Sequence, residues 1–175
     1  VKVLLKKPWA PIGRHLDYAA VEITRERHFA YITMGSNMGN KEENLKNAMK
    51  KIEEVSGIKI IKTSSLIVTE PWGNENQEEF LNAAIKVETY LTPRELMSEL
   101  LRIEHELGRV REMKWGPRII DLDIVLYDDI VSNDEFVILP HPLMHLRDFV
   151  LKPLNEIAPY ALHPLKNKRI FELIE

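Results

Sequence analysis

The stretch that decides the fold is WGPRIIDLDIVLYDD, residues 115–129. Apolar and β-branched residues are dense over residues 119–126, which predicts a buried strand. Because successive side chains of a strand alternate between its two faces, Asp121, Asp123 and Val125 are expected on one face. The residues expected on the opposite face, against a core, are Ile120, Leu122, Ile124 and Leu126.

The two aspartates of this strand point to a metal site. A rise of about 3.3 Å per residue separates their Cα atoms by roughly 7 Å. Two like charges at that distance repel each other unless a cation lies between them. Carboxylate oxygens suit Mg²⁺, which also binds substrate phosphates, and Arg118 just upstream could hold a phosphate. The alternative is an edge strand with solvated aspartates, and the D-x-D spacing alone does not decide between the two.

Length and composition favour one soluble, globular domain with a substantial core. The 175 residues are 45% hydrophobic and 29% charged. A formal net charge of −3 argues against broad nucleic-acid binding through a basic surface. The chain has no cysteine, which excludes thiolate chemistry and predicts a reducing, cytoplasmic location. No apolar run has membrane-spanning length and the first residues lack a signal-peptide pattern, so no membrane partner is expected.

The order of elements predicts an α+β fold. Strands are expected at residues 28–35, 58–69 and 80–89, before the D-x-D strand. Apolar residues recur at helical spacing in residues 41–55 and again after Thr92 and Pro93, which are a typical N-cap and first helical residue. The resulting βαββαβ order predicts a ferredoxin-like sheet with two helices on one face. C-terminal additions are expected as a short strand at residues 137–139 and a last helical turn within residues 168–174.

Residues 1–27 are expected to form a separate β-hairpin, with residues 28–175 as the main domain. Two strand-like runs flank a turn near Pro11 and Gly13, and a lone hairpin needs a sheet to join. The segments KKPWAPI and LDYAAVEITRER resemble the C-terminal end of dihydroneopterin aldolase, which implies that Lys7 occupies the position of the catalytic lysine. Only about the last quarter of such a domain is present, so we expect no aldolase activity. The sequence leaves open whether a full aldolase domain precedes Val1 in the parent protein.

Several loop residues could bind a nucleotide or a flat ring. The basic candidates are Arg109, Arg111, Arg118, Arg147 and His141, which could converge on a polyphosphate or remain solvated charges. The aromatic candidates are Phe80, Trp115 and Phe149, which could stack on a ring or belong to the core. Asn82 is a polar residue on an apolar strand, where its amide could bind a heterocycle edge or a backbone group of the protein.

Four ordered motifs then identify a family resemblance. They are GSNMGN, TEPWG followed by QEEFLN, GRVREMKWGPRIIDLDIVLY, and LPHPLMHLRDFVL. Together they make residues 28–175 similar to 6-hydroxymethyl-7,8-dihydropterin pyrophosphokinase. The resemblance implies a ferredoxin-like enzyme of folate biosynthesis that requires magnesium. It implies transfer of the pyrophosphoryl group of ATP to the pterin hydroxymethyl group, with release of AMP.

The resemblance also implies roles for individual residues. Asp121 and Asp123 correspond to the ligands of two Mg²⁺ ions. The implied ATP-binding set is Glu104, Arg109, Arg111, Arg118, Ile124, His141 and Arg147, of which Arg109 and Arg118 join the aspartates as catalytic residues. The implied pterin-binding set is Thr69, Pro71, Trp72, Phe80, Asn82, Trp115 and Phe149. Arg111 and Trp115 would lie on a loop that closes over the site.

Two other classes of protein remain open from the residues alone. A Mg²⁺-dependent nuclease or phosphatase could use Asp121 and Asp123 with water as the nucleophile. A ferredoxin-like binding module would have no catalysis. Neither needs a pterin-shaped slot around Trp72 and Asn82, so the acceptor pocket discriminates. No general base stands out in the sequence, and phosphoryl transfer depends mainly on positioning and charge stabilisation.

Overall fold

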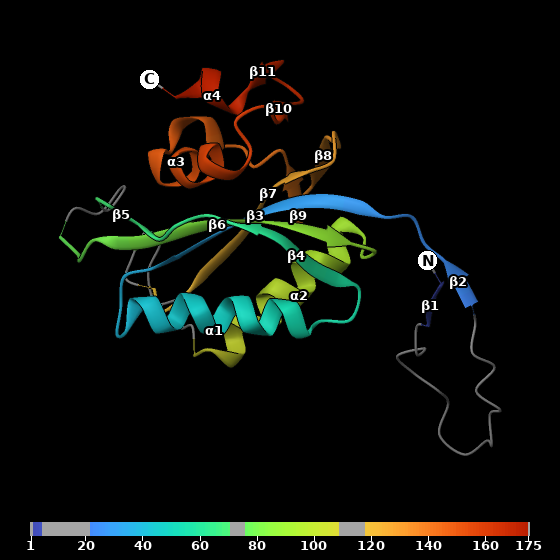
Figure 1. The fold of residues 1–175 in the computed structure, drawn as a ribbon, viewed down its shortest axis with the longest axis horizontal. Coiled ribbons are helices and arrows are strands. Elements are labelled where there is room, and N and C mark those ends of the chain that lie inside the picture. The colour runs from blue at the N-terminus through green and yellow to red at the C-terminus, as the bar shows by residue number, and fades with distance from the viewer. Residues whose placement is uncertain (1, 5–21, 71–75, 109–117, 175) are drawn as a thin grey trace.

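The structure, a computed structural model, describes residues 2–4, 22–70, 76–108 and 118–174 (Figure 1). The candidate residues that lie outside these ranges are Lys7, Pro71, Trp72, Arg109, Arg111 and Trp115. No helix in the described ranges is both long and apolar enough to cross a membrane.

The main sheet has the predicted ferredoxin-like connectivity. Its strands are β3 (His28–Ser36), β4 (Ile58–Thr63), β5 (Ile67–Thr69), β6 (Phe80–Thr89) and β7 (Asp121–Tyr127). They pair antiparallel in the order β4-β6-β3-β7, and β5 pairs with β6 beyond the end of β4. Helix α1 (Lys41–Glu54) connects β3 to β4, and α2 (Pro93–Glu106) connects β6 to β7. The predicted α+β class and βαββαβ order are confirmed.

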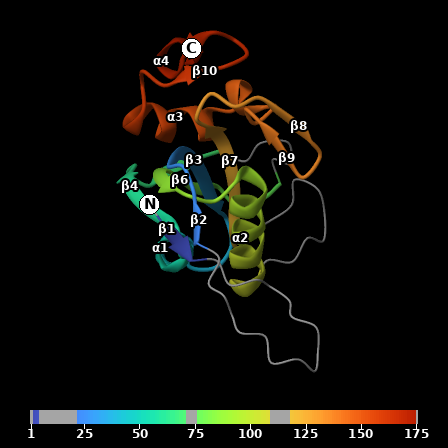
Figure 2. The ribbon, with the colours of Figure 1, turned by 90° about the vertical axis from the view of Figure 1, so that its right-hand side faces the viewer.

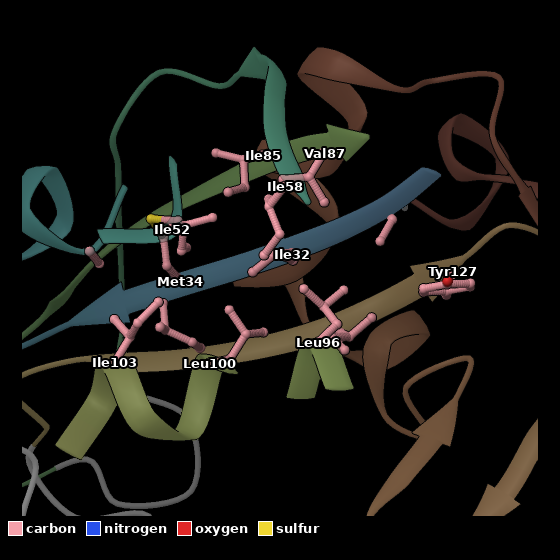
Figure 3. Packing of buried hydrophobic residues seen from close by; sticks show 14 of the residues in the cluster. Ile32, Met34, Ile52, Ile58, Ile85, Val87, Leu96, Leu100, Ile103 and Tyr127 are labelled. Atoms are coloured by element: carbon pink, nitrogen blue, oxygen red, sulfur yellow. The ribbon is translucent and has the colours of Figure 1, made fainter. Parts of the chain in front are cut away.

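Helices α1 and α2 lie together on one face of the sheet (Figure 1). Helix α2 begins at a capping box in which Thr92 and Glu95 bond each other's backbone amides. Its apolar side chains Leu96, Leu100 and Ile103 pack on the sheet with Ile32 of β3 (Figure 3). All four are fully buried, so the predicted helical spacing does identify the core-facing side of α2.

The opposite face of the sheet is covered by the C-terminal region (Figures 1 and 2). This region contains η1 (Met144–Leu146), α3 (Asp148–Ile157), β10 (Leu162–His163), β11 (Lys168–Arg169) and α4 (Ile170–Leu173). Helix α3 was not predicted, because Pro153 in its interior lacks an N–H and makes the segment read as irregular. The predicted short strand is β9 (Val137–Leu139), which pairs with β8 (Ser132–Asp134), and the last helical turn is α4.

A β-bulge in β7 corrects one prediction. Tyr31 of β3 pairs with Leu126 while Ile32 pairs with Ile124, so Val125 is the extra residue. The bulge breaks the alternation of side chains, and both Val125 and Leu126 join the cluster under α3. The expectation that Leu126 faces the same core as Leu122 was therefore wrong.

The N-terminal strands form a small sheet of their own. β1 (Lys2–Leu4) pairs antiparallel with β2 (Glu22–Thr24), which confirms the predicted hairpin pairing, although its turn lies outside the described residues. Within the described residues the pair does not join the main sheet (Figures 1 and 2). The chain that follows is tied to α2, because the Arg25 guanidinium bonds the Glu95 carboxylate at 2.5 and 3.2 Å and the Tyr90 carbonyl at 3.2 Å.

We expect Arg25→Ala to destabilise the start of α2. Arg25 lowers the pKa of Glu95, the residue that completes the capping box. Because Glu95 is 38% exposed, the loss should not exceed about 1 kcal/mol, which corresponds to a Tm decrease of about 2–4 °C. Arg27→Ala is the matched control, since Arg27 is 59% exposed and 3.6 Å from Glu88. Equal Tm values for the two variants would contradict this role for Arg25.

Candidate active site

A pocket opens on the face of the sheet that carries α3. Strands β3, β6 and β7 provide its floor, and the start of α3 provides one wall. The lining residues are Thr33, Met34, Gly35, Phe80, Asn82, Arg118, Asp121, Asp123, Arg147 and Phe149. Seven of these ten are among the predicted site residues. Thr33, Met34 and Gly35 were not among the predicted site residues, although Gly35 lies in the GSNMGN motif.

The alternation of β7 presents both aspartates to the pocket. Asp121 and Asp123 are partly exposed, whereas Leu122 between them is fully buried in the core on the α2 side. Opposite them on β3 lie Gly35, which pairs with Asp121, and Thr33, which pairs with Asp123. The two carboxylates therefore stand on one side of one strand, as the D-x-D spacing predicts.

The start of α3 brings a cation and an aromatic ring to the same pocket. The Arg147 guanidinium lies 5.4 Å from the centre of the Phe149 ring. Burial lowers the pKa of Arg147, while the nearby Asp123 and Asp121 carboxylates raise it. An arginine remains protonated under these opposing influences, so Arg147 contributes a fixed positive charge facing the carboxylates.

Asn82 is held at the floor of the pocket by neighbouring strands. Its side-chain amide donates a hydrogen bond to the Thr69 hydroxyl of β5, and its exposed fraction is only 3%. Gly35 lies beside it on β3, where an added Cβ would be 2.7 Å from the Asn82 amide oxygen and 3.4 Å from the Phe80 ring. Glycine is required here for space next to Asn82. Thr69 thus belongs to the site through Asn82, although it does not line the pocket.

His141 lies beside the charged end of the pocket as a neutral donor. Its backbone N–H bonds the carbonyl of Val125, the bulged residue of β7, at 3.0 Å. Its Nδ1 accepts a bond from the Leu143 N–H at 3.3 Å, so the ring proton resides on Nε2. Burial and Arg147 lower the pKa of His141 to about 4, against an opposing influence from Asp121. At neutral pH, His141 can therefore donate a hydrogen bond but carries no charge.

Asn37 is a residue that the sequence analysis missed. Its side-chain oxygen accepts from the Arg118 N–H at 2.7 Å, and its own N–H donates to the Arg118 carbonyl at 3.0 Å. Its amide nitrogen donates to the Gln77 side chain at 2.8 Å and to the Glu78 carbonyl at 3.2 Å. Asn37 is 2% exposed and lies within the GSNMGN motif, whose asparagines were the available signal. It fixes Arg118 relative to the segment that leads into β6.

Glu104 and Ile124 occupy a different place from the other predicted residues. Ile124 is 3% exposed and packs in the core between the sheet and α2. Glu104 on α2 is 2% exposed and accepts a hydrogen bond from the Leu122 N–H at 3.0 Å. Neither side chain lines the pocket, so a nucleotide contact at Ile124 would have to come from its backbone on the edge strand.

The donor set of the pocket fits a hard divalent cation. Asp121 and Asp123 offer oxygen ligands only, and among the described residues no cluster of three or more His, Cys, Asp or Glu side chains could hold a metal. Mg²⁺ commonly takes one or two carboxylates and completes its shell with water and substrate phosphates. Arginines facing these carboxylates suit the phosphates themselves. The fold and the donor set of the pocket therefore suit a metal-assisted phosphate-transfer enzyme built on a ferredoxin-like sheet.

Comparison with known proteins narrows this class to one family. Residues 31–159 match the family 7,8-dihydro-6-hydroxymethylpterin-pyrophosphokinase (HPPK). The chain is 45% identical over 130 residues to the 2-amino-4-hydroxy-6-hydroxymethyldihydropteridine pyrophosphokinase of Methylorubrum extorquens, covering 74% of this chain and 82% of that protein. It is 41% identical over 142 residues to the enzyme of that name from Aquifex aeolicus, covering 81% and 88%. The chain belongs to the HPPK family.

A solved structure has the same fold at low sequence identity. It is described as Plasmodium falciparum HPPK-DHPS with pteroate, and it matches with a TM-score of 0.69 and 16% identity. The match covers 87% of this chain and 43% of that one, so the chain spans less than half of this structural relative. At this identity the similarity supports the fold alone.

We expect Gly35→Ala to displace Asn82. The added methyl group would overlap the Asn82 amide oxygen, and overpacking of this kind lowers the free energy of unfolding by about 1–3 kcal/mol. In an Asn82→Ala background the overlap is absent, so Gly35→Ala should then have little effect. Urea unfolding of the four proteins of this cycle gives the measurement. An equal loss in both backgrounds would contradict the contact.

Proposed function

We propose that this pocket catalyses the HPPK reaction, transfer of pyrophosphate from ATP to 6-hydroxymethyl-7,8-dihydropterin in folate biosynthesis. The hydroxymethyl oxygen attacks the β-phosphorus of ATP, and the bond from that phosphorus to the α,β-bridging oxygen breaks. AMP leaves, the pterin diphosphate forms, and the hydroxyl proton passes to solvent. The observation that carries the proposal is that two carboxylates, two aromatic side chains and the Asn82 amide line one pocket.

Asp121 and Asp123 are the proposed ligands of two Mg²⁺ ions. Their position on one side of β7, with Arg147 nearby and their oxygen-only chemistry, supports this assignment. When bound, the ions would neutralise phosphate charge and stabilise the charge that develops during transfer. With this arrangement the chain does not need a strong general base, because phosphoryl transfer depends on positioning and charge stabilisation.

Arg118, Arg147 and His141 are the proposed contacts to the triphosphate. The two guanidinium groups supply charge, and the neutral His141 supplies an Nε2–H donor. Arg109 and Arg111 join this set through the family resemblance, with Arg109 and Arg118 as catalytic residues. We assign Ile124 a backbone contact to the nucleotide, because its side chain is buried in the core.

Phe80, Phe149 and Asn82 are the proposed contacts to the pterin. The two aromatic side chains can stack on the flat ring, and the Asn82 amide, supported by Thr69, can bond its polar edge. Pro71, Trp72 and Trp115 complete the proposed acceptor pocket by resemblance. A nuclease or phosphatase would need no such slot, which favours the pyrophosphokinase over that alternative.

Residues 1–27 are proposed to be a C-terminal fragment of an aldolase-like domain, preceding the pyrophosphokinase domain of residues 28–175. The support is the resemblance of the hairpin segments and the existence of larger relatives. The Folic acid synthesis protein fol1 of Pneumocystis carinii is 42% identical over 159 residues, which is 91% of this chain and 21% of that protein. An upstream aldolase domain in the parent protein and a cytoplasmic location remain predictions.

The reaction itself gives a direct test. Incubation with ATP, Mg²⁺ and the hydroxymethylpterin should release AMP in an amount equal to the pterin diphosphate formed. Without the pterin, no AMP should appear beyond background. Release of ADP, or ATP breakdown that does not depend on the pterin, would rule out the proposed function.

Asp121→Asn and Asp123→Asn should each lower turnover by about 100-fold or more, because each removes a metal ligand. Tm should stay the same or rise slightly, since one of two repelling charges is removed. Asp129→Asn is the control, because Asp129 is exposed just beyond the end of β7. Near-native turnover of either ligand variant at ordinary Mg²⁺ concentration would contradict the metal assignment.

A further inference from the structure

β7 carries the proposed metal ligands, yet it is an edge strand. Among the described strands it pairs only with β3, and it contacts α2 and β9 without pairing with either. On its outer side, an edge strand has backbone N–H groups that donate no hydrogen bond to a neighbouring strand. The Leu122 N–H is one of these groups, and it donates to the Glu104 carboxylate of α2 at 3.0 Å.

Glu104 is an unusual residue at this position of α2. It is 2% exposed and follows Ile103, which is fully buried with Leu100 in the core. Burying a carboxylate is unfavourable unless hydrogen bonds replace its water shell. The bond from the Leu122 N–H is one such hydrogen bond, so Glu104 holds the Leu122 amide in place.

The bond between Glu104 and the Leu122 N–H lies at the position along β7 from which the two aspartates project. Leu122 lies directly between Asp121 and Asp123, and its fully buried side chain points to the face opposite theirs. The strand is also held at the bulge, where the His141 N–H bonds the Val125 carbonyl. On its inner side β7 is held by β3, which pairs with Asp121, Leu122 and Asp123. Of the two bonds on the outer side, the one to His141 is three residues away from Leu122, and the one to Glu104 acts on the backbone between the two carboxylates.

We propose that Glu104 is a positioning residue for the metal site. Through the Leu122 N–H it replaces the missing strand neighbour and fixes the peptide units from which Asp121 and Asp123 project. The separation and direction of the two carboxylates, and hence the affinity for divalent cations, depend on this bond. The inference rests on the proposed function, since it takes the two aspartates as metal ligands.

Three variants separate the hydrogen bond from the charge. Glu104→Gln keeps an acceptor oxygen at the same reach without charge, and Glu104→Asp keeps the charge but withdraws it by one methylene. Glu104→Met keeps the approximate size and removes the acceptor. We expect faster Leu122 amide exchange in the unliganded Met and Asp variants, by about tenfold, and an exchange rate within about threefold of wild type for Gln.

Cation binding supplies the second readout. Mg²⁺ titrations in the presence of a non-hydrolysable ATP analogue should show a Kd about tenfold weaker for the Met and Asp variants, and nearly unchanged for Gln. The Ala84 amide is the internal reference for exchange, because its N–H donates to the Ser64 hydroxyl at 2.9 Å on another strand of the sheet. Glu95→Gln is the matched control on α2, expected to lower Tm without changing Mg²⁺ affinity.

The outcomes are distinct. The inference is overturned if the Asp and Met variants bind Mg²⁺ like wild type, or if Gln is as impaired as they are, since the charge would then be the important property. If Met does not fold, Gln and Asp alone decide between the two. Absence of pterin-dependent AMP release by the wild-type protein would reject the proposed function instead, while the exchange of Leu122 would still test the bond.

Discussion

The mutual repulsion of two carboxylates on one side of β7 is the constraint around which the site is arranged. Asp121 and Asp123 share a face because a strand repeats every two residues, and the same repeat buries Leu122 behind them. The pair is tolerable only where positive charge can approach. Positive charge can approach because the pocket leaves this part of the sheet uncovered. Arg147 on the wall of the pocket is one such positive group.

The C-terminal region meets this requirement while still covering the rest of the sheet. Helix α3 packs on β5, β6 and β3, so its body closes the apolar part of the second face. Its N-terminal end, in contrast, lies at the pocket, with Arg147 at the N-cap and Phe149 in the first turn. One helix therefore seals the core with its body and supplies both a cation and an aromatic ring with its N-terminal end. The boundary between core and site falls within a single element.

The sequence predicted those features of the fold and the site that depend on a few neighbouring residues. The alternation over Asp121, Leu122 and Asp123 and the cap at Thr92 are local patterns, and both predictions were confirmed. The bulge at Val125 was not predictable from the sequence. Residues 124–126 are all apolar, so the pattern is the same with or without an extra residue in the strand. The requirement for Gly35 is equally non-local, since it comes from the Asn82 side chain on the neighbouring strand.

Hydrogen bonds between residues far apart in the sequence also fix the position of the proposed metal and phosphate residues relative to the proposed pterin residues. The proposed metal ligands Asp121 and Asp123 lie on β7, an edge strand of the described sheet. An edge strand is paired on one side only, so its backbone is held by fewer hydrogen bonds than that of a central strand. Asn37 compensates at one end, because a single buried amide bonds both Arg118 and the segment that leads into β6. The bulged Val125 compensates at the other end by accepting from His141. Since in-line transfer tolerates little displacement of donor against acceptor, these side-chain and loop contacts matter as much as the ligands themselves.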